Sequence, residues 1–105
     1  MSQYHMYENL NPNSRQTYPY LIDVQTTLLT DLETRVVIPV ALKSKFGKGI
    51  IKHLSPIITI NKKEYVIITQ QISGIPSRQL GSSVCDCLSL RQDILSAIDF
   101  LITGI

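Results

Sequence analysis

Residues 35–40, Arg-Val-Val-Ile-Pro-Val, decide the fold class because they form a nearly continuous apolar run of strand length. A run of this kind is typical of a β-strand that is buried on both faces. Pro39 has no backbone N–H, so we expect it to end ladder pairing on one side of the strand. The stretch therefore predicts a buried strand at residues 35–40.

Two further strands are predicted before this run. Residues 3–8 alternate in polarity and are rich in aromatic side chains, which indicates a first strand. Residues 18–26 form a second strand, and its Pro19 belongs at the start of the strand or on a sheet edge. A polar turn separates the two strands. The pair Leu28-Leu29 then lies in a connection and has no evident strand partner.

A hairpin is predicted after the run. Residues 56–60 and 64–70 are strand-like and flank the short turn Asn61-Lys62-Lys63. Residues 71–75 either continue the second of these strands or bulge before a proline. Residues 77–88 contain Gly and Ser at turn-forming density, so we expect turns there.

The C-terminal segment predicts an amphipathic helix. Ser89 followed by Gln92 matches a capping box with Ser89 as N-cap, and Asp93 in the first turn suits the helix dipole. At the α-helical period, one apolar stripe forms the expected core face: Leu90, Ile94, Ala97, Ile98, Leu101 and Ile105. The opposite stripe is polar and holds Gln92, Ser96, Asp99 and Thr103, while Leu95, Ile102 and Phe100 lie on the shoulders. Because Ile102 is apolar and lies off the core stripe, it is expected either in a binding patch or in a dimer interface.

The order of elements defines the fold class. About six strands followed by one helix, with no alternation of strands and helices, indicate a mainly β protein. We expect a small antiparallel barrel or sandwich packed by a C-terminal α-helix, in a single domain over residues 1–105.

Composition narrows the function classes. Only 17% of the residues are charged and 44% are hydrophobic, so a surface is expected to be buried against a partner, most simply in a homodimer. The net charge of +2 is too small to argue for nucleic acid by itself. The chain shows no signal peptide and no membrane-spanning apolar run, so a cytoplasmic location without membrane contact is expected.

No catalytic or metal site is predicted. The chain has no recognisable nucleophile–base motif and no phosphate-binding loop. Cys85 and Cys87 are one residue apart, which is poor spacing for a disulfide or a redox motif and indicates two small half-buried residues in a turn. His5 and His53 do not stand at ligand spacing from them and are expected to be solvated. We therefore expect no metal and no cofactor, and the motifs identify no catalytic residue.

Residues 43–53 form the one basic cluster, and Gly47 and Gly49 predict a flexible loop there. The cluster is either a solvated loop or a landing site for an acidic partner segment or for nucleic acid. Only Phe46 supplies an aromatic ring inside it, which is little for stacking bases.

Three stretches stand out when they are taken together: Tyr-Leu-Ile-Asp-Val-Gln at residues 20–25, Arg-Val-Val-Ile-Pro-Val at residues 35–40, and Ala-Ile-Asp-Phe-Leu-Ile-Thr-Gly-Ile at residues 97–105. Together they resemble the CcdB toxin family, the toxin half of the Ccd toxin–antitoxin module. The strand-like segments between them fall in the same order, so the resemblance covers the whole chain.

The resemblance implies a homodimeric SH3-like barrel with a C-terminal helix. It implies a toxin that binds the A subunit of DNA gyrase, traps the gyrase–DNA cleavage complex and blocks replication and transcription, without catalysing a reaction. It implies neutralisation by the antitoxin CcdA, with which the toxin co-represses its operon, so that DNA is contacted only through the antitoxin or gyrase. The matching gyrase-binding positions are Leu28, Leu29, Asp99, Ile102, Thr103, Gly104 and Ile105.

Two of these positions depart from the family pattern. The best-known members carry Trp where this chain has Thr103 and Asn where it has Asp99. A buried Trp often dominates an interface, and Thr cannot supply the same area. A folded but non-toxic chromosomal relic is therefore one alternative. An mRNA endoribonuclease of the MazF type, which shares the barrel, is another, with Arg35, Arg78, His53 and the lysine loop as its candidate residues.

The antitoxin site is expected in the basic cluster, because its lysines would suit an acidic antitoxin segment. Its candidate residues are Lys43, Lys45, Phe46, Lys48 and Lys52.

Overall fold

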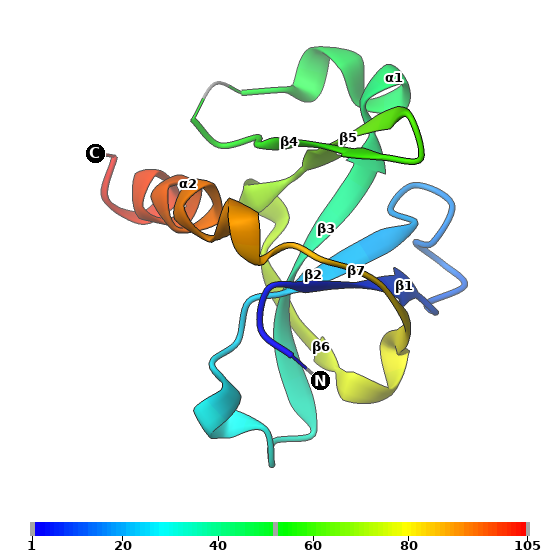
Figure 1. Cartoon of the computed structure of the whole chain (residues 1–105), viewed down its shortest axis with the longest axis vertical. Coiled ribbons are helices and arrows are strands. Elements are labelled where there is room, and N and C mark those ends of the chain that lie inside the picture. Colours follow the sequence, from blue (N-terminus) through cyan, green and yellow to red (C-terminus); the bar gives the residue numbers. More distant parts are fainter. Residues whose placement is uncertain (1, 52, 105) are drawn as a thin grey trace.

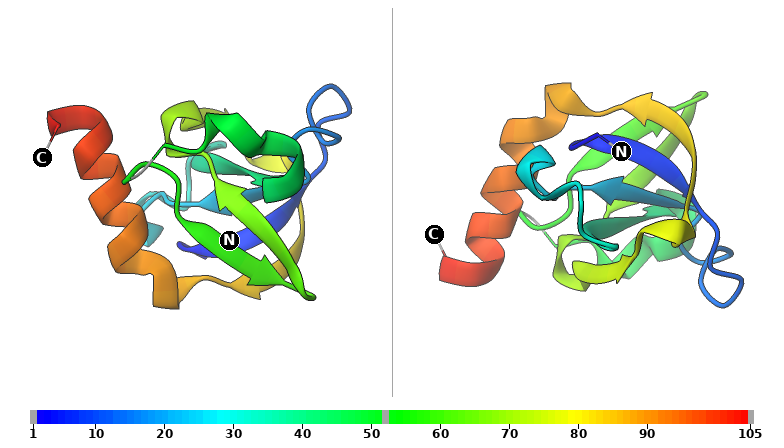
Figure 2. Two further views of the ribbon diagram at one scale, coloured as in Figure 1. Left: turned by 90° about the horizontal axis from the view of Figure 1, so that it is seen from above. Right: turned by 90° about the horizontal axis from the view of Figure 1, so that it is seen from below.

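A curled antiparallel sheet is the main feature of the fold (Figure 1). The computed structural model describes residues 2–51 and 53–104, except the side chain of Lys48. Its strands pair in the order β4-β5-β3-β2-β1-β7, and β6 also pairs with β3. The strands are β1 (His5–Asn9), β2 (Tyr20–Asp23), β3 (Thr34–Leu42), β4 (Ile57–Ile60), β5 (Lys63–Ile67), β6 (Ser73–Pro76) and β7 (Leu80–Asp86). Figures 1 and 2 show the sheet curled into a half-barrel, with the C-terminal helix α2 (Arg91–Thr103) along one side. The prediction of a mainly β, SH3-like barrel with a C-terminal helix is confirmed.

β3 organises the sheet because it has three partners. One of its edges pairs with β2, while the other pairs first with β6 and then with β5. Pro39 lies between these last two partners, and its carbonyl accepts a hydrogen bond from the backbone N–H of Ile68 at 2.9 Å. Pro39 has no backbone N–H, and it lies at the point where the partner of β3 changes from β6 to β5. The prediction that Pro39 ends pairing on one side of the strand is confirmed.

The main core lies between the sheet and α2. The short 3₁₀ turn η3 (Thr69–Gln71) follows β5 and packs against both β3 and α2. Ile94 and Ala97 of α2 are fully buried, and Ile94 belongs to one cluster with Met6 and Ile38. Leu90, Ile98 and Leu101 are half-buried, so the expected core stripe is confirmed, except at Ile105, which lies outside the described residues.

The hairpin between β4 and β5 is confirmed and is tighter than expected. Ile60 pairs with Lys63, so only Asn61 and Lys62 form the turn. Their φ angles are 50° and 67°, the left-handed pair that a type I′ turn needs. Asn suits this conformation, whereas Lys62 adopts it without the freedom of glycine.

The prediction of turns over residues 77–88 is wrong, because β7 occupies most of that segment and raises the strand count to seven. The Gly and Ser residues there are turn formers in isolation, but pairing with β1 holds them in a strand with two register shifts. A Cβ on Gly81 would lie 2.9 Å from Cδ2 of Leu10 and 3.1 Å from Cβ of Glu8. This close approach of β1 explains the glycine better than a turn does.

The predicted capping box is also wrong. A 3₁₀ turn, η5 (Leu88–Leu90), precedes α2 and has Ser89 in its middle. The N-cap is therefore Leu90, and none of the described side chains caps the helix. Asp86 serves the start of this turn instead, because its Oδ1 accepts a hydrogen bond from the N–H of Leu88 at 2.8 Å.

The basic segment is not simply a loop, as its glycines had suggested. It contains a helical turn, α1 (Lys43–Phe46), followed by the 3₁₀ turn η2 (Gly47–Gly49). Phe46 packs against the core cluster of Ala41, Val66 and Ile68, and this packing overrides the weak local preference. Gly47, with φ of 50°, ends the helix and donates to the carbonyl of Lys43.

Candidate functional site

An exposed apolar tip lies between β2 and β3. It is the 3₁₀ turn η1 (Thr27–Leu29), in which Leu28 is 90% exposed and Leu29 is about half exposed. Thr26 begins the turn, because its hydroxyl accepts a hydrogen bond from the N–H of Leu28 at 3.3 Å. A large apolar side chain so fully in solvent contributes nothing to the core, so the tip is a candidate contact surface.

A buried ion pair lies beneath this tip. The carboxylate oxygen Oδ2 of Asp23 accepts a hydrogen bond from Nε of Arg35 at 2.9 Å, and Nη2 of Arg35 lies 2.7 Å from the same oxygen in the ion pair. Both side chains are almost entirely buried. The other carboxylate oxygen accepts from the N–H of Gln25 at 3.0 Å, and Nη2 of Arg35 also approaches the Gln25 carbonyl at 3.3 Å. A charge pair that is so fully hydrogen-bonded holds the end of β2 rigidly against β3.

Gln25 connects this ion pair to the tip. Its side-chain oxygen accepts from the N–H of Val36 at 3.0 Å, and its side-chain nitrogen donates to the carbonyl of Leu29 at 3.0 Å. Both ends of one buried amide are therefore used, one on the sheet and one on η1. Asp23, Gln25 and Arg35 are here called the β2–β3 polar network.

A second exposed apolar feature lies at the end of α2. Ile102 is 75% exposed, and Asp99 and Thr103 are exposed beside it. The hydroxyl of Thr103 donates to the carbonyl of Asp99 at 2.7 Å, so it is bonded to the backbone of its own helix. Gly104 ends the helix in the left-handed conformation, with φ of 76°, and donates to the carbonyl of Phe100. The predicted exposure of Ile102 off the core stripe is confirmed.

The structure leaves these two features apart within one chain. Figures 1 and 2 draw η1 and the C-terminal half of α2 on the same side of the molecule, and Figure 1 separates them along its long axis. Leu28 and Leu29 are thus grouped on one turn, and Asp99, Ile102, Thr103 and Gly104 on one helix end. Ile105, the last of the predicted gyrase contacts, lies outside the described residues.

The predicted antitoxin residues share one region but differ in environment. Lys45 is exposed, and Nζ of Lys43 lies 3.5 Å from Oε1 of Glu64 in an exposed ion pair. Phe46 is half-buried because it packs on the core. Lys52 and the side chain of Lys48 lie outside the described part of the chain.

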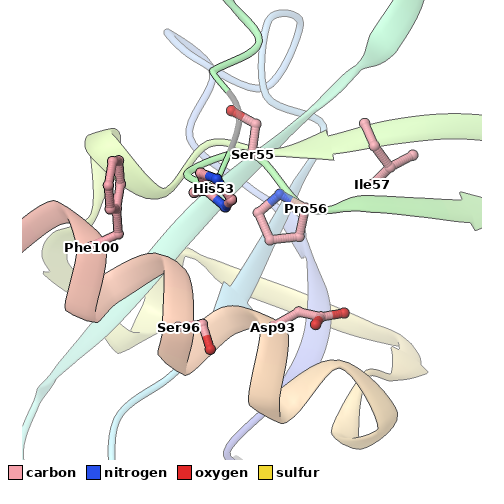
Figure 3. Close-up of a pocket in the computed structure, with 7 residues that line it drawn as sticks. All are labelled: His53, Ser55, Pro56, Ile57, Asp93, Ser96 and Phe100. Carbon is pink, nitrogen blue, oxygen red and sulfur yellow. The ribbon is translucent and has the colours of Figure 1, made fainter. Parts of the chain in front are cut away.

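A cavity of about 440 Å³ lies between α2 and the segment that enters β4, and Figure 3 shows its lining. The lining residues are His53, Ser55, Pro56, Ile57, Asp93, Ser96 and Phe100. The rings of His53 and Phe100 are tilted against each other with centroids 5.6 Å apart. His53 is exposed, as expected, and has a left-handed φ of 73°.

Both cysteines are free, and the prediction of two half-buried turn residues fails in part for each, because Cys85 lies in a strand and Cys87 is buried. Cys85 belongs to β7 and Cys87 precedes η5, with their sulfur atoms 3.7 Å apart. Burial, followed by the neighbouring Cys85, raises the pKa of the Cys87 thiol to about 12, so this thiol is protonated at neutral pH. Within residues 2–51 and 53–104, no three His, Cys, Asp or Glu side chains cluster as metal ligands would. The described helices include none long and apolar enough to cross a membrane.

The β2–β3 polar network is the part of the site that sequence reasoning missed. Its signal was present, since Asp23 and Gln25 alternate at the end of one strand and Arg35 begins a run that is otherwise apolar. A charged residue at the start of such a buried strand needs a buried partner, and Asp23 was the nearest acid on a neighbouring strand.

The model of the CcdB protein family matches residues 3–104, nearly the whole chain. This match includes the exposed tip, the polar network beneath it and the described end of α2. The chain belongs to the CcdB family, the toxins of the CcdA/CcdB toxin–antitoxin system.

Proposed function

We propose that this toxin binds the A subunit of DNA gyrase and traps the gyrase–DNA cleavage complex, which blocks replication and transcription. The toxin itself catalyses no reaction in this proposal; it acts as an inhibitor that occupies a surface of its target. CcdA neutralises it, and the toxin–antitoxin complex represses its own operon.

The observation that carries the proposal is the exposure of Leu28 and Ile102, at 90% and 75%. Both stand at positions where the family resemblance implies gyrase contacts. Large apolar side chains that protrude from a small protein are typical of interface anchors, because burying them on binding is favourable. A toxin that works by contact rather than by catalysis needs such anchors.

Two further partners belong to the proposal. A homodimer would cover apolar surface on a chain in which only 17% of residues are charged. The antitoxin would approach the basic segment, where Lys45 is exposed and Lys43 is held only in an exposed ion pair with Glu64. Exposed lysines of this kind attract an acidic segment and speed its association.

The endoribonuclease alternative receives less support from the geometry. Arg35, one of its candidate residues, is buried and bound to Asp23, so it cannot approach an RNA phosphate without breaking the ion pair. The turn that carries Arg78, η4 (Ser77–Gln79), lies between β6 and β7, whereas His53 lines the cavity beside α2. The described candidates therefore lie on different elements, and one of them is already bound inside the protein.

The experiment is a gyrase cleavage assay with matched leucine variants. Purified toxin, gyrase and supercoiled DNA are expected to give linear, gyrase-linked DNA. Leu28→Ala is expected to raise the toxin concentration needed by about 10- to 100-fold, the usual effect of truncating an interface anchor. The control is Leu88→Ala, because Leu88 is also an exposed leucine in a 3₁₀ turn, at 56%, but lies in η5, which precedes α2.

Equal potency of the two leucine variants would remove Leu28 from the contact surface. Absence of cleavage complexes with the wild-type protein would refute the gyrase proposal. If wild-type toxin bound the A subunit of gyrase in a titration and still trapped no DNA, the chain would be a folded, non-toxic relic. Cleavage of RNA by the same preparation would favour the endoribonuclease.

A further inference from the structure

We propose that Gln25 is a positioning residue for target binding, which holds the Leu28-Leu29 tip in place through the β2–β3 polar network. This inference rests on the proposed function, because it concerns how the gyrase-binding tip is fixed. Gln25 itself makes no contact with the target.

The hydrogen bonds support this role. Two described side chains form hydrogen bonds with the backbone of η1. Thr26 accepts from the N–H of Leu28 with its hydroxyl, and from that of Leu29 with its carbonyl, inside the turn itself. Gln25 is the second, and it reaches η1 from the sheet. Because its oxygen is fixed by Val36 on β3, the bond from its nitrogen to the Leu29 carbonyl ties the tip to the sheet. A tip with exposed side chains has little packing of its own to hold its shape.

The ion pair fixes Gln25 in turn. Asp23 accepts from the N–H of Gln25, and Arg35 donates to its carbonyl, so the Gln25 backbone is held on both sides. Gln25 is itself 6% exposed, which leaves its side chain little room to turn away. The ion pair of Asp23 and Arg35 therefore holds Gln25, and Gln25 in turn holds the tip. A tip held in its binding geometry avoids the entropy cost of ordering it on contact.

The test separates the two ends of the amide. Gln25→Glu keeps an oxygen for the N–H of Val36 but removes the donor to Leu29, and Gln25→Met is a neutral second variant of similar length that removes both bonds. Ile67→Val, a buried change in β5 outside the network, is the control for a general loss of stability. Gyrase affinity is measured for each variant alone and combined with Leu28→Ala/Leu29→Ala. Backbone order parameters of Leu28 and Leu29 are measured by ¹⁵N relaxation in the free toxin.

Gln25→Glu is expected to raise the Kd for the A subunit of gyrase by about tenfold. In the Leu28→Ala/Leu29→Ala background it is expected to raise the Kd almost no further, because residues that act through one another have non-additive effects. The order parameters at the tip are expected to fall from about 0.85 toward 0.6 in both Gln25 variants and to stay unchanged in Ile67→Val. An equal penalty in both backgrounds, or unchanged order parameters, would overturn the inference. If the wild-type protein does not bind gyrase, the proposed function fails, and the order parameters alone decide the positioning role.

Discussion

Thr103 is the residue at which the proposed gyrase-binding surface differs most from the pattern that the family resemblance implies. Its hydroxyl is committed to the carbonyl of Asp99, and its side chain is exposed at the end of α2. It is therefore a small side chain at a position where, by the family resemblance, the best-known members carry Trp. Since no core contact depends on Thr103, the position is free to change without cost to the fold.

Thr103→Trp is therefore expected to tighten gyrase binding, by about 10- to 100-fold, because an aromatic anchor buries far more area than Thr. The melting temperature is expected to change little, since the side chain is exposed and the lost hydrogen bond lies on the helix surface. Titration of the A subunit of gyrase measures the affinity, and Ser96→Trp on the same helix controls for a non-specific aromatic effect. Equal gains from both variants would contradict a specific anchor site at residue 103.

At the scale of single elements, the start of α2 shows how a local sequence signal can fail. The Ser89–Gln92 pair has the spacing of a capping box, but η5 moves the true helix start to Arg91. The cap function passes to Asp86, which is the last residue of β7 and accepts from the N–H of Leu88. The connection between β7 and α2 thus depends on a carboxylate that belongs to the sheet.

Asp86→Ala is expected to lower the free energy of unfolding by about 1 kcal/mol, the usual cost of losing a capping acceptor. Ser89→Ala is expected to change it by less than about 0.5 kcal/mol, because Ser89 caps nothing. Urea denaturation of the two variants beside the wild-type protein measures both values. A larger loss at Ser89 than at Asp86 would restore the capping box.

The elements predicted best are those whose sequence pattern lies entirely within the element itself. The apolar run of β3 and the 3.6-residue period of α2 hold their own information, and both lie close to the predicted residues. β7 could not be found in this way, because its Gly81 is set by contact with β1 some seventy residues earlier. The polar network failed for the same reason, since Asp23 and Arg35 meet only after β2 and β3 pair. The exposure of Ile102 was predictable because helix phasing alone determines it.

At the scale of the whole molecule, the chain carries few charges, since only 17% of its residues are charged where about 25% is usual. Exposed large apolar side chains lie on several elements, and Val36 on β3 and Ile102 on α2 are among them. With so few charges, part of this exposed apolar surface is expected to be covered by association. A second copy of the chain is the simplest way to cover part of it.

The purified toxin is expected to sediment with twice the 11.8 kDa mass of one chain. Because the expected interface is mainly apolar, raising the salt concentration to about 0.5 M is not expected to dissociate it, since salt screens charges and not apolar contacts. Equilibrium sedimentation at low and high salt measures both points. A mass of one chain at micromolar concentration, or dissociation by salt alone, would contradict an apolar homodimer.

The separation between the exposed leucines and the amide that holds their backbone has an evolutionary consequence. Leu28 can be exchanged without disturbing the hydrogen bonds of Gln25, because those bonds reach the main chain of η1 and not its side chains. When the target of a host changes during evolution, the toxin could therefore adapt by substituting one or two surface residues, while the buried polar network stays unchanged. Substitutions would be concentrated at the tip, and adaptation to a new host would not require changes in the core of the fold.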